Sequence, residues 1–193
     1  VVFISDEIYH GICFGPEDET AIKFSSAAWI INSFSKYYSM TGWRLGWMVV
    51  PEDFVDPINR LAQNMYISPP SLSQLAGVTA FDCRQELDGH LERYKENRSV
   101  LLEGLASMGF TDVAPADGAF YIYVDVSRQV KDSVRMAWSL LEDAGVAITP
   151  GIDFEDPASD LGRQRVRLSY CGSTEDMREG VRRMKSWWST YRE

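Results

Sequence analysis

The sequence predicts an α/β fold made of short buried strands and amphipathic helices. Three apolar runs, at 1–5, 29–34 and 45–50, are short and lack polar alternation, as strands do when helices cover both faces of a sheet. Longer stretches place apolar residues three and four positions apart, which is the spacing of amphipathic helices. With 45% hydrophobic and 24% charged residues, the composition excludes the disordered and fibrous classes.

Two helices are expected after the third strand. Pro51 ends that strand, and the segment 53–64 repeats apolar side chains at helical spacing. Pro69-Pro70 then breaks the chain, because proline lacks an amide hydrogen and fixes φ. The segment 71–83 follows as the next expected helix.

The stretch 86–109 predicts one long helix. Apolar side chains recur there three or four residues apart, and Gly109 stands where a helix commonly ends. Its roughly 22 helical residues would be about 33 Å long at 1.5 Å per residue, which is enough to connect two structural units. We expect the polar run 95–98 to be a solvated face of this helix.

A compact α/β unit is expected after the long helix. Its elements are a strand at 119–126, a helix at 131–144, a strand at 146–149, a polar loop at 151–162, a strand at 166–170 and a final helix. Ser173, followed three residues later by Asp176, resembles a capping box at the start of that last helix.

Charge and residue usage exclude several classes of function. The 19 basic and 28 acidic residues give a net charge of −9, which disfavours nucleic acid as a partner because phosphate contacts need clustered cations. The longest apolar runs fall far below the ~20 residues of a membrane span, so no membrane partner is expected. Three scattered cysteines and two histidines indicate reduced thiols in a cytoplasmic protein, with no disulfide framework and no metal site.

The start of the chain carries a further expectation. It opens at Val1 with a strand that needs neighbours to pair with, and it lacks the basic and small-residue pattern of a signal peptide. We therefore expect the chain to be the C-terminal part of a longer protein.

The most informative stretch joins the second and third strands. Ser33 and Ser35 stand two apart at the end of a strand, so their hydroxyls can share one side. Two hydroxyls and the guanidinium of Arg44 would make a phosphate clamp. Lys36 beside such a clamp could form a Schiff base with a phosphate-bearing aldehyde once its amine is neutral. The plainer alternative is a solvated loop lysine and an ordinary surface arginine.

This stretch resembles the cofactor-lysine segment of class I/II aminotransferases, the aspartate-aminotransferase-like branch of fold-type I pyridoxal-phosphate (PLP) enzymes. Its matching residues are Ser33-Phe34-Ser35-Lys36 and Met40-Thr41-Gly42-Trp43-Arg44-Leu45-Gly46-Trp47. Further segments match the family in the expected order, and together they cover essentially the whole chain. They are Ser5-Asp6-Glu7-Ile8-Tyr9, residues 64–74, Gly118-Ala119-Phe120-Tyr121, Pro150-Gly151 with Phe154, and Arg165-Val166-Arg167-Leu168-Ser169-Tyr170.

The resemblance implies a role for the residues that would touch the cofactor ring. Lys36 would hold the aldehyde of pyridoxal 5'-phosphate as a Schiff base and later move the substrate proton. Asp6 would pair with the pyridine nitrogen and keep the ring protonated; without the family, a turn residue at a strand end explains it equally well. Tyr9 would hydrogen-bond the ring oxygen, with simple packing as its alternative.

The resemblance also assigns the phosphate and substrate contacts. Ser33, Ser35 and Arg44 would hold the phosphate, and Arg167 would bind the substrate α-carboxylate as a planar two-pronged donor. Arg165 lies on the same strand face by two-residue alternation and is the competing choice. A surface strand arginine is the plainer alternative for Arg167.

For the whole chain, the resemblance implies a PLP-dependent aminotransferase that transfers an amino group between an amino acid and a 2-oxo acid by a ping-pong route. Residues 1–85 would be the C-terminal part of the large PLP-binding domain, with a three-layer and mostly parallel sheet. Residues 86–109 would be the connecting helix, and residues 110–193 the small domain. A homodimer is expected, as is an incomplete site, because the family's N-terminal half supplies further cofactor contacts.

Two other functions stay open at this point. A lyase could use the same cofactor and scaffold with a different outcome, and an aminotransferase-like domain could be the ligand sensor of a transcription regulator. The segment 61–64 lacks the arginine that some dicarboxylate-specific members carry near it, which tilts the expectation away from strict aspartate specificity.

Overall fold

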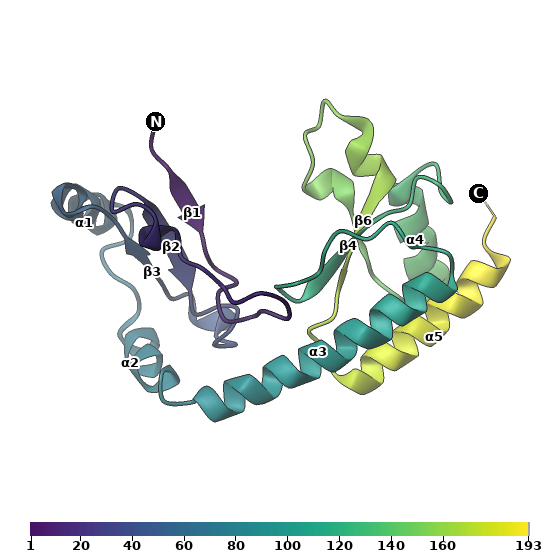
Figure 1. Cartoon of the computed structure of the whole chain (residues 1–193), viewed down its shortest axis with the longest axis horizontal. Helices are drawn as coiled ribbons and strands as arrows, with labels where there is room; N and C mark the ends of the chain where they lie inside the picture. The colour runs from purple at the N-terminus through teal and green to yellow at the C-terminus, as the bar shows by residue number, and fades with distance from the viewer. Residues whose placement is uncertain (193) are drawn as a thin grey trace. The chain divides into compact units, whose positions relative to one another are not determined.

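The computed structural model describes residues 1–192, which form two compact units, one from Val1 to His90 and one that begins at Leu91. Both units contain helices and a three-stranded sheet (Figure 1), which confirms the predicted α/β class. Within the described residues, no helix combines the length and the apolar character that a membrane span requires.

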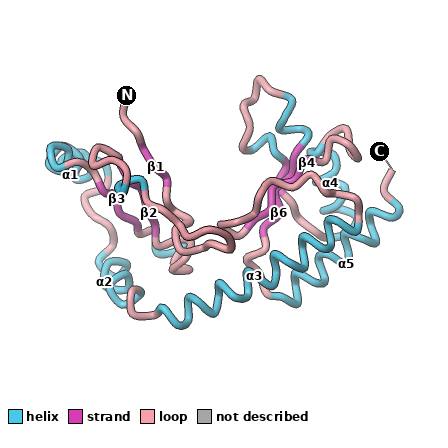
Figure 2. The backbone as a smooth tube through the Cα atoms, in the orientation of Figure 1, coloured by secondary structure: helices cyan, strands magenta, loops and turns pink. Residues whose placement is uncertain are grey.

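Three strands form the sheet of the first unit, in the order β1 (Ile4–Asp6), β2 (Trp29–Ser33) and β3 (Gly46–Val49). β1 and β2 are parallel, whereas β2 and β3 are antiparallel, with Ser33 opposite Gly46. This part of the sheet is therefore mixed, where a mostly parallel sheet was expected. A parallel pair needs a long connection, and residues 7–28 supply one that is loop apart from a short helical turn, η1 (Ala21–Lys23) (Figure 2).

The two longer helices of the first unit, α1 (Val55–Met65) and α2 (Ser71–Ala80), lie close to the predicted segments 53–64 and 71–83. Two short helical turns precede them, η2 (Thr41–Trp43) and η3 (Glu52–Phe54). α2 packs against the connection between β2 and β3, because a Cβ atom on Gly77 would lie only 2.6 Å from Leu45 Cδ2. The buried Ser73 hydroxyl also donates to the Trp43 carbonyl at 2.7 Å. These contacts hold the segment that carries Lys36.

A small apolar core lies where this connection meets α2. Its buried members are Phe34, Met40 and Ala80, with Tyr38, Leu45, Trp47 and Ala76 packed around them. The Phe34 ring lies edge-on to the Trp47 ring at a centroid distance of 5.1 Å, a favourable arrangement for aromatic side chains. The residues beside Lys36 are therefore fixed by packing on one side.

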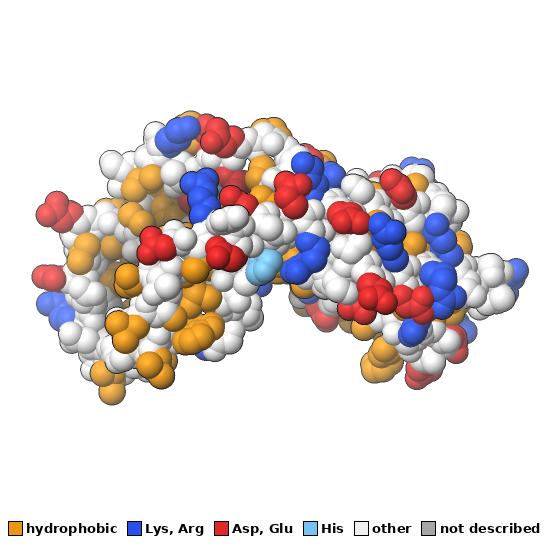
Figure 3. All heavy atoms as spheres, turned by 90° about the horizontal axis from the view of Figure 1, so that it is seen from below, with side chains coloured by type: hydrophobic (Ala, Val, Ile, Leu, Met, Phe, Trp, Pro, Cys, Tyr) orange, Lys and Arg blue, Asp and Glu red, His pale blue; other side chains and the backbone are white. Residues whose placement is uncertain are grey.

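Much of the apolar surface of the first unit is uncovered. Large apolar side chains are exposed at the start of the chain and along α1 and α2, among them Phe3, Ile4, Leu61, Met65, Leu72 and Leu75. Figure 3 shows apolar side chains gathered on the surface of this unit. Extended apolar surface of this kind is typical of a face that another segment or chain covers.

One continuous helix, α3 (Arg84–Ser107), occupies the segment predicted as 86–109. It ends where predicted, because Gly109 adopts φ +88°, and the Phe110 amide donates back to the Leu105 carbonyl at 3.0 Å. Glycine reaches this left-handed conformation without a steric penalty. The predicted helix end is confirmed.

The polar run 95–98 is solvated only in its first half: Lys95 and Glu96 are exposed as expected, but for Asn97 and Arg98 the expectation was wrong. Asn97 is fully buried and donates its amide hydrogens to the carbonyls of Tyr170 and Gly172, both at 3.0 Å. Arg98 donates to the Ala116 carbonyl at 2.6 Å. Residues distant in sequence supply these acceptors, so the local pattern could not reveal them. Asn97 ties α3 to the end of the last strand.

The sheet of the second unit is antiparallel throughout. Its strands have the order β4 (Tyr121–Asp125), β6 (Arg165–Ser169) and β5 (Thr149–Pro150), and its helices are α4 (Ser133–Ala144) and α5 (Thr174–Thr190). Figure 1 shows α5 beside the C-terminal part of α3, where an ion pair of 2.9 Å joins Arg178 to Glu96. Ile122, Val124, Val166 and Leu168 are buried, so the alternating residues of β4 and β6 occupy the other face.

The helix caps of the second unit follow the sequence closely. Ser173 Oγ accepts from the Asp176 amide at 3.0 Å, as the predicted capping pair requires. At the C-terminal end of α4, Gly145 is left-handed at φ +65°, and the amide of Val146 donates to the carbonyl of Leu140. Because this helix cap takes up the chain after Gly145, β5 begins later than the predicted strand 146–149. The predicted loop 151–162 contains the short helical turn η4 (Gly151–Asp153) and the start of a second one, η5 (Asp160–Gln164).

Candidate active site

The candidate site of the first unit lies at one edge of its sheet. Asp6 ends β1 and Ser33 ends β2, and these strands are parallel neighbours. The carboxyl ends of parallel strands meet at the same edge, where α/β proteins commonly bind ligands. Asp6 is exposed, and its Oδ1 accepts a long hydrogen bond of 3.3 Å from the Ile8 amide. The other oxygen can accept a donor from a ligand.

The turn after β1 carries Tyr9 and is anchored by Glu7. One carboxylate oxygen of Glu7 accepts from the Ala21 amide at 2.8 Å and from Thr20 Oγ1 at 3.1 Å, and the other lies 3.1 Å from His10 Nδ1. Burial works to raise the pKa of Glu7, but the hydrogen bonds outweigh it and lower the pKa below its ordinary value. A charged Glu7 therefore fixes the turn. The only sequence signal for this role is the acidic pair Asp6-Glu7 at the strand end.

The connection after β2 brings Lys36 to the same place. The Lys36 Nζ atom lies 5.3 Å from the centroid of the Tyr9 ring, within the range of a cation–π contact. Thr41 Oγ1 donates to the Ser35 carbonyl at 2.6 Å, and the Met40 amide donates to the Phe34 carbonyl at 3.0 Å. The structure thus brings Lys36 and Tyr9 together at the edge of the sheet where β1 ends with Asp6.

The residue after Lys36 links this loop to its surroundings. Tyr37 donates its hydroxyl to Asp88 Oδ1 at 2.8 Å, and burial together with that carboxylate raises the pKa of Tyr37 to about 12. Gly11 packs so tightly on the Tyr37 ring that a Cβ atom would lie 2.9 Å away, and its φ is +89°. Glycine is therefore required at this position. Ser39 Oγ lies 3.1 Å from His90 Nδ1 and holds the far end of the loop.

The residues predicted to bind the phosphate, Ser33, Ser35 and Arg44, lie on the same loop or directly before it. Ser33 Oγ accepts from the Ser35 amide at 3.0 Å, and no hydrogen bond to the Ser35 hydroxyl occurs among residues 1–192. Arg44 is exposed at φ +52°, and its Nη1 donates to the Thr41 carbonyl at 3.0 Å. The other guanidinium hydrogens of Arg44 remain available for a ligand. A left-handed non-glycine residue at this position is consistent with a functional constraint.

The second unit places the two competing arginines in different surroundings. Arg165 Nη1 lies 2.7 Å from Glu155 Oε1, in an ion pair that the sequence did not predict. The Arg167 guanidinium instead lies 4.2 Å from the centroid of the Phe154 ring and 5.5 Å from that of the Tyr121 ring. No carboxylate among the described residues pairs with Arg167. This contrast supports Arg167 as the residue that is able to bind an external carboxylate.

The cysteines do not form a site. Cys13, Cys83 and Cys171 are free thiols, and within residues 1–192 no cluster of three histidine, cysteine, aspartate or glutamate side chains could hold a metal ion.

Comparison with known proteins shows where this arrangement recurs. The family profile described as "Aminotransferase class I and II" matches residues 1–184. A curated relative, the valine–pyruvate aminotransferase of Mycobacterium tuberculosis, is 47% identical over 191 residues, which cover 97% of this chain and 48% of the relative. The chain therefore spans about half the length of the curated relatives it matches.

Solved structures agree with the sequence comparison. The crystal structure of an aminotransferase from Mycobacterium tuberculosis superposes with a TM-score of 0.92 at 46% identity and covers 97% of this chain and 49% of that one. The aspartate aminotransferase of Thermus thermophilus with maleate gives a TM-score of 0.85 at 31% identity, over 95% of this chain and 47% of that one. These likenesses extend over both units.

Proposed function

The chain belongs to the class I and II aminotransferase family, and from that premise we propose that it is part of a pyridoxal-phosphate-dependent aminotransferase. The reaction would move an amino group between an amino acid and a 2-oxo acid by a ping-pong route. The observation that carries the proposal is the convergence of Lys36, Tyr9 and Asp6 at the carboxyl edge of β1 and β2.

The donor and acceptor groups at this edge fit pyridoxal phosphate. The cofactor's aldehyde requires an amine, and its protonated ring nitrogen requires a carboxylate. Its phosphate requires hydrogen-bond donors such as a guanidinium and a hydroxyl. Lys36, Asp6, Arg44 and Ser35 supply them from two neighbouring connections of the sheet. When bound, pyridoxal phosphate would supply an electron-withdrawing ring that stabilises negative charge on the substrate α-carbon.

Lys36 would have two tasks in this reaction. Its Nζ would bind the cofactor aldehyde in the resting enzyme, and once displaced by a substrate amine it would carry a proton to and from the α-carbon. The packing of Phe34 and the link from Tyr37 to Asp88 would hold its backbone still, because proton transfer requires a fixed distance between donor and acceptor.

The other residues would bind and orient. Asp6 would accept a hydrogen bond from the ring nitrogen and keep that nitrogen protonated. Tyr9 would donate to the ring oxygen. Ser33, Ser35 and Arg44 would hold the phosphate. Arg167 in the second unit would bind the substrate carboxylate with its two parallel N–H donors.

Valine and pyruvate are the substrate pair that we propose to test first. A relative at 47% identity is named for this pair, and the segment 61–64 lacks an arginine for a second carboxylate. The matched families include proteins named for aspartate as well, so aspartate is the natural competitor. A preference for an apolar side chain would distinguish this protein from those relatives.

Domain roles, assembly and location complete the proposal. We propose that residues 1–85 belong to a large cofactor-binding domain and 110–193 to a small domain, with 86–109 as the connecting helix. We also propose a cytoplasmic homodimer, for which the three free thiols and the uncovered apolar surface of the first unit are the support. Sedimentation of the purified protein and fractionation of the cells that make it test these two points.

The amino-transfer reaction itself is the test of function. The enzyme that contains this chain, loaded with pyridoxal phosphate, is expected to convert L-valine and pyruvate to 2-oxoisovalerate and alanine in equal amounts. L-Aspartate with pyruvate serves as the comparison substrate. Elimination or ring closure of an amino acid without formation of the amino product would favour the lyase, and no turnover of any amino acid by the loaded enzyme would contradict the proposal.

A further inference from the structure

The segment 151–162 leaves β5 and returns to β6, and one carboxylate fastens it to the sheet. Glu155 Oε1 accepts from Arg165 Nη1 at 2.7 Å and from the Tyr123 hydroxyl at 2.8 Å. The Glu155 and Arg165 side chains are only 21% and 31% exposed. A carboxylate oxygen that accepts from a guanidinium and a phenol at these lengths makes strong, charge-assisted hydrogen bonds.

The charge state of this network is fixed near neutral pH. The hydrogen bond from Arg165 and that from Tyr123 lower the pKa of the Glu155 carboxyl. Burial and the hydrogen bond to Glu155 raise the pKa of Tyr123 to about 12. Glu155 is thus a carboxylate and Tyr123 a protonated phenol across the physiological range, so the charges on this network do not change there.

The two ends of the segment, Gly151 and Gly162, are also packed tightly together. A Cβ atom on Gly151 would lie 2.8 Å from the Gly162 carbonyl oxygen and 2.8 Å from the Tyr123 hydroxyl oxygen. A Cβ atom on Gly162 would lie 2.8 Å from Ile152 Cα. Both ends therefore meet backbone to backbone, and only glycine fits at either end. The segment has little freedom to move as a hinged flap.

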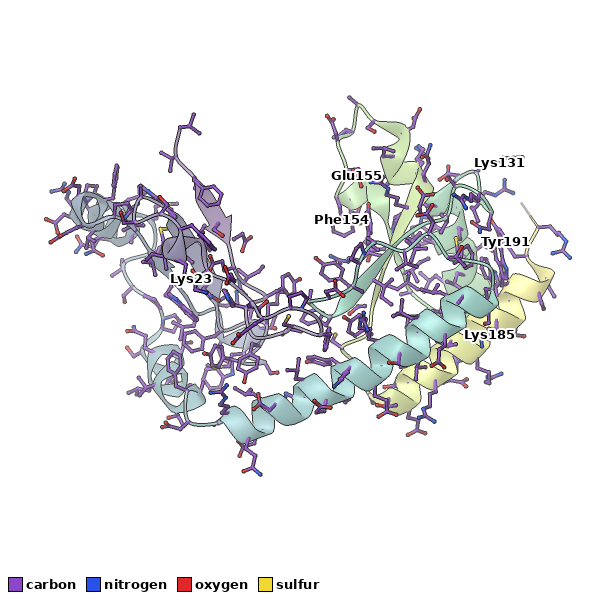
Figure 4. All side chains as sticks on the ribbon, in the orientation of Figure 1. Lys23, Lys131, Phe154, Glu155, Lys185 and Tyr191 are labelled. Atoms are coloured by element: carbon purple, nitrogen blue, oxygen red, sulfur yellow. The ribbon has the colours of Figure 1, made fainter. Side chains whose placement is uncertain are left out.

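The hydrogen bonds of Glu155 also restrict the position of its neighbour in sequence, Phe154. Its ring centroid lies 4.2 Å from the guanidinium carbon of Arg167 and 6.4 Å from the Tyr123 ring centroid. The Phe154 side chain is 48% exposed, so burial alone does not hold it in place. Figure 4 shows Phe154 and Glu155 next to each other on this segment of the second unit.

We propose that Glu155, held by Arg165 and Tyr123, is a positioning residue that seats Phe154 against Arg167 and thereby orients the Arg167 guanidinium for the substrate carboxylate. The inference rests on the proposed function of Arg167. A guanidinium binds a carboxylate best when its plane is fixed, since two parallel hydrogen bonds must form together. A ring at 4.2 Å supplies that fixation by cation–π attraction and steric contact.

The same network explains why the second arginine of β6 is present. Arg165 and Arg167 project from one face of the strand, opposite Asp125 and Tyr123 of β4. Because Arg165 engages Glu155, this carboxylate, which directly follows Phe154 in sequence, is neutralised by Arg165 and does not pair with Arg167. Arg165 thus anchors the segment 151–162, and Arg167 is left to bind the substrate carboxylate.

Steady-state kinetics of the holoenzyme test this inference. Glu155→Ala is expected to raise KM for L-valine about tenfold, with kcat changed by less than about twofold, because misplacement of a binding group weakens substrate and transition state alike. Glu155→Gln keeps an oxygen acceptor and is expected to recover part of the loss. The matched control is Glu179→Ala, which removes a carboxylate paired with Arg182 and Arg183 on α5 and should leave KM unchanged.

A thermodynamic cycle tests whether Glu155 acts through Phe154. If it does, Phe154→Ala and the double variant with Glu155→Ala should raise KM by similar factors, whereas independent effects would multiply. Calorimetric binding of isovalerate, which has the carboxylate and carbon skeleton of valine without its amine, gives a readout that needs no turnover. Its dissociation constant is expected to rise about as much as KM.

The outcomes separate the two levels of the proposal. Unchanged KM and unchanged isovalerate affinity in a folded Glu155→Ala enzyme would overturn this inference alone, as would effects that multiply in the double variant. If Glu155→Ala does not fold, Tyr123→Phe and Glu155→Gln carry the same test with smaller expected changes. A wild-type enzyme without amino-transfer activity would instead overturn the proposed function, whatever the variants show.

Discussion

The two units of the chain cover their apolar side chains to very different degrees. The second unit buries the apolar faces of its sheet and of α4 and α5, so that Ile122, Val124, Val126, Leu140 and Tyr170 are almost inaccessible to solvent. In the first unit, most large apolar side chains of α1 and α2 are exposed. Its buried apolar side chains are few, namely Ile12, Ala28, Ile30, Leu87 and the cluster around Phe34.

The unit with more buried apolar side chains is not the unit that carries the proposed cofactor residues. A buried aliphatic or aromatic side chain contributes about 1.5–3 kcal/mol relative to an exposed one, so the second unit holds most of the folding free energy of the chain. The proposed cofactor residues lie in the first unit, on loops fixed by single hydrogen bonds and by one small aromatic core. The proposed substrate arginine lies on a strand of the well-packed unit.

Lys36→Ala is expected to have the largest effect on function. The variant should lose turnover by at least about 10⁴-fold, because both the covalent attachment and the proton carrier disappear together. Its thermal unfolding should remain close to that of the wild type, since Lys36 is only half-buried and lies in the loop that follows β2. Turnover that survives at more than a few per cent would assign the chemistry elsewhere.

A matched pair of leucine truncations tests the packing difference directly. Leu140→Ala in α4 removes a side chain that is 1% exposed and is expected to cost about 2–5 kcal/mol of unfolding free energy. Leu75→Ala in α2 removes one that is 68% exposed and is expected to cost less than about 0.5 kcal/mol. Urea unfolding of the chain measures both. Similar costs for the two variants would show that α2 is covered in solution.

Arg167→Gln sharpens the functional side of the comparison. Loss of a two-pronged charged contact is expected to raise KM for L-valine about 100-fold, in line with the 2–3 kcal/mol of a charge-assisted pair. Arg165→Gln should raise it only about tenfold, because Arg165 acts through Glu155. Steady-state kinetics compares the two. A larger effect for Arg165 would reverse the assignment of the two arginines.

Acid sensitivity of the first unit is the smallest effect expected. The pKa of Glu7 is lowered in the folded protein, so its contribution to stability is present above the ordinary value of about 4.5 and is lost as the pH falls through the lowered value. Glu7→Gln should cost about 1 kcal/mol at neutral pH, since it keeps an acceptor but not the charge. The difference from wild type should vanish in strong acid, and a difference that persists there would assign the loss to packing.

The elements of the fold were largely predictable from local pattern, whereas the anchors of the site were not. The capping residue Ser173 and the helix end at Gly109 act on neighbours in sequence, so their motifs were sufficient. Asn97 and Glu155 find partners 73 and 10 residues away, and no local pattern marks such contacts. Arg165 and Arg167 could not be distinguished by alternation alone, since both occupy one strand face.

The most direct test of the account is to locate the covalent cofactor. The enzyme that contains this chain would be loaded with pyridoxal phosphate, reduced with borohydride and digested, and the labelled peptide identified by mass spectrometry. We expect the pyridoxyl group on Lys36, and its absence from that peptide in the Lys36→Ala variant. A label on any of the other lysines, with Lys36 unmodified, would contradict the central claim.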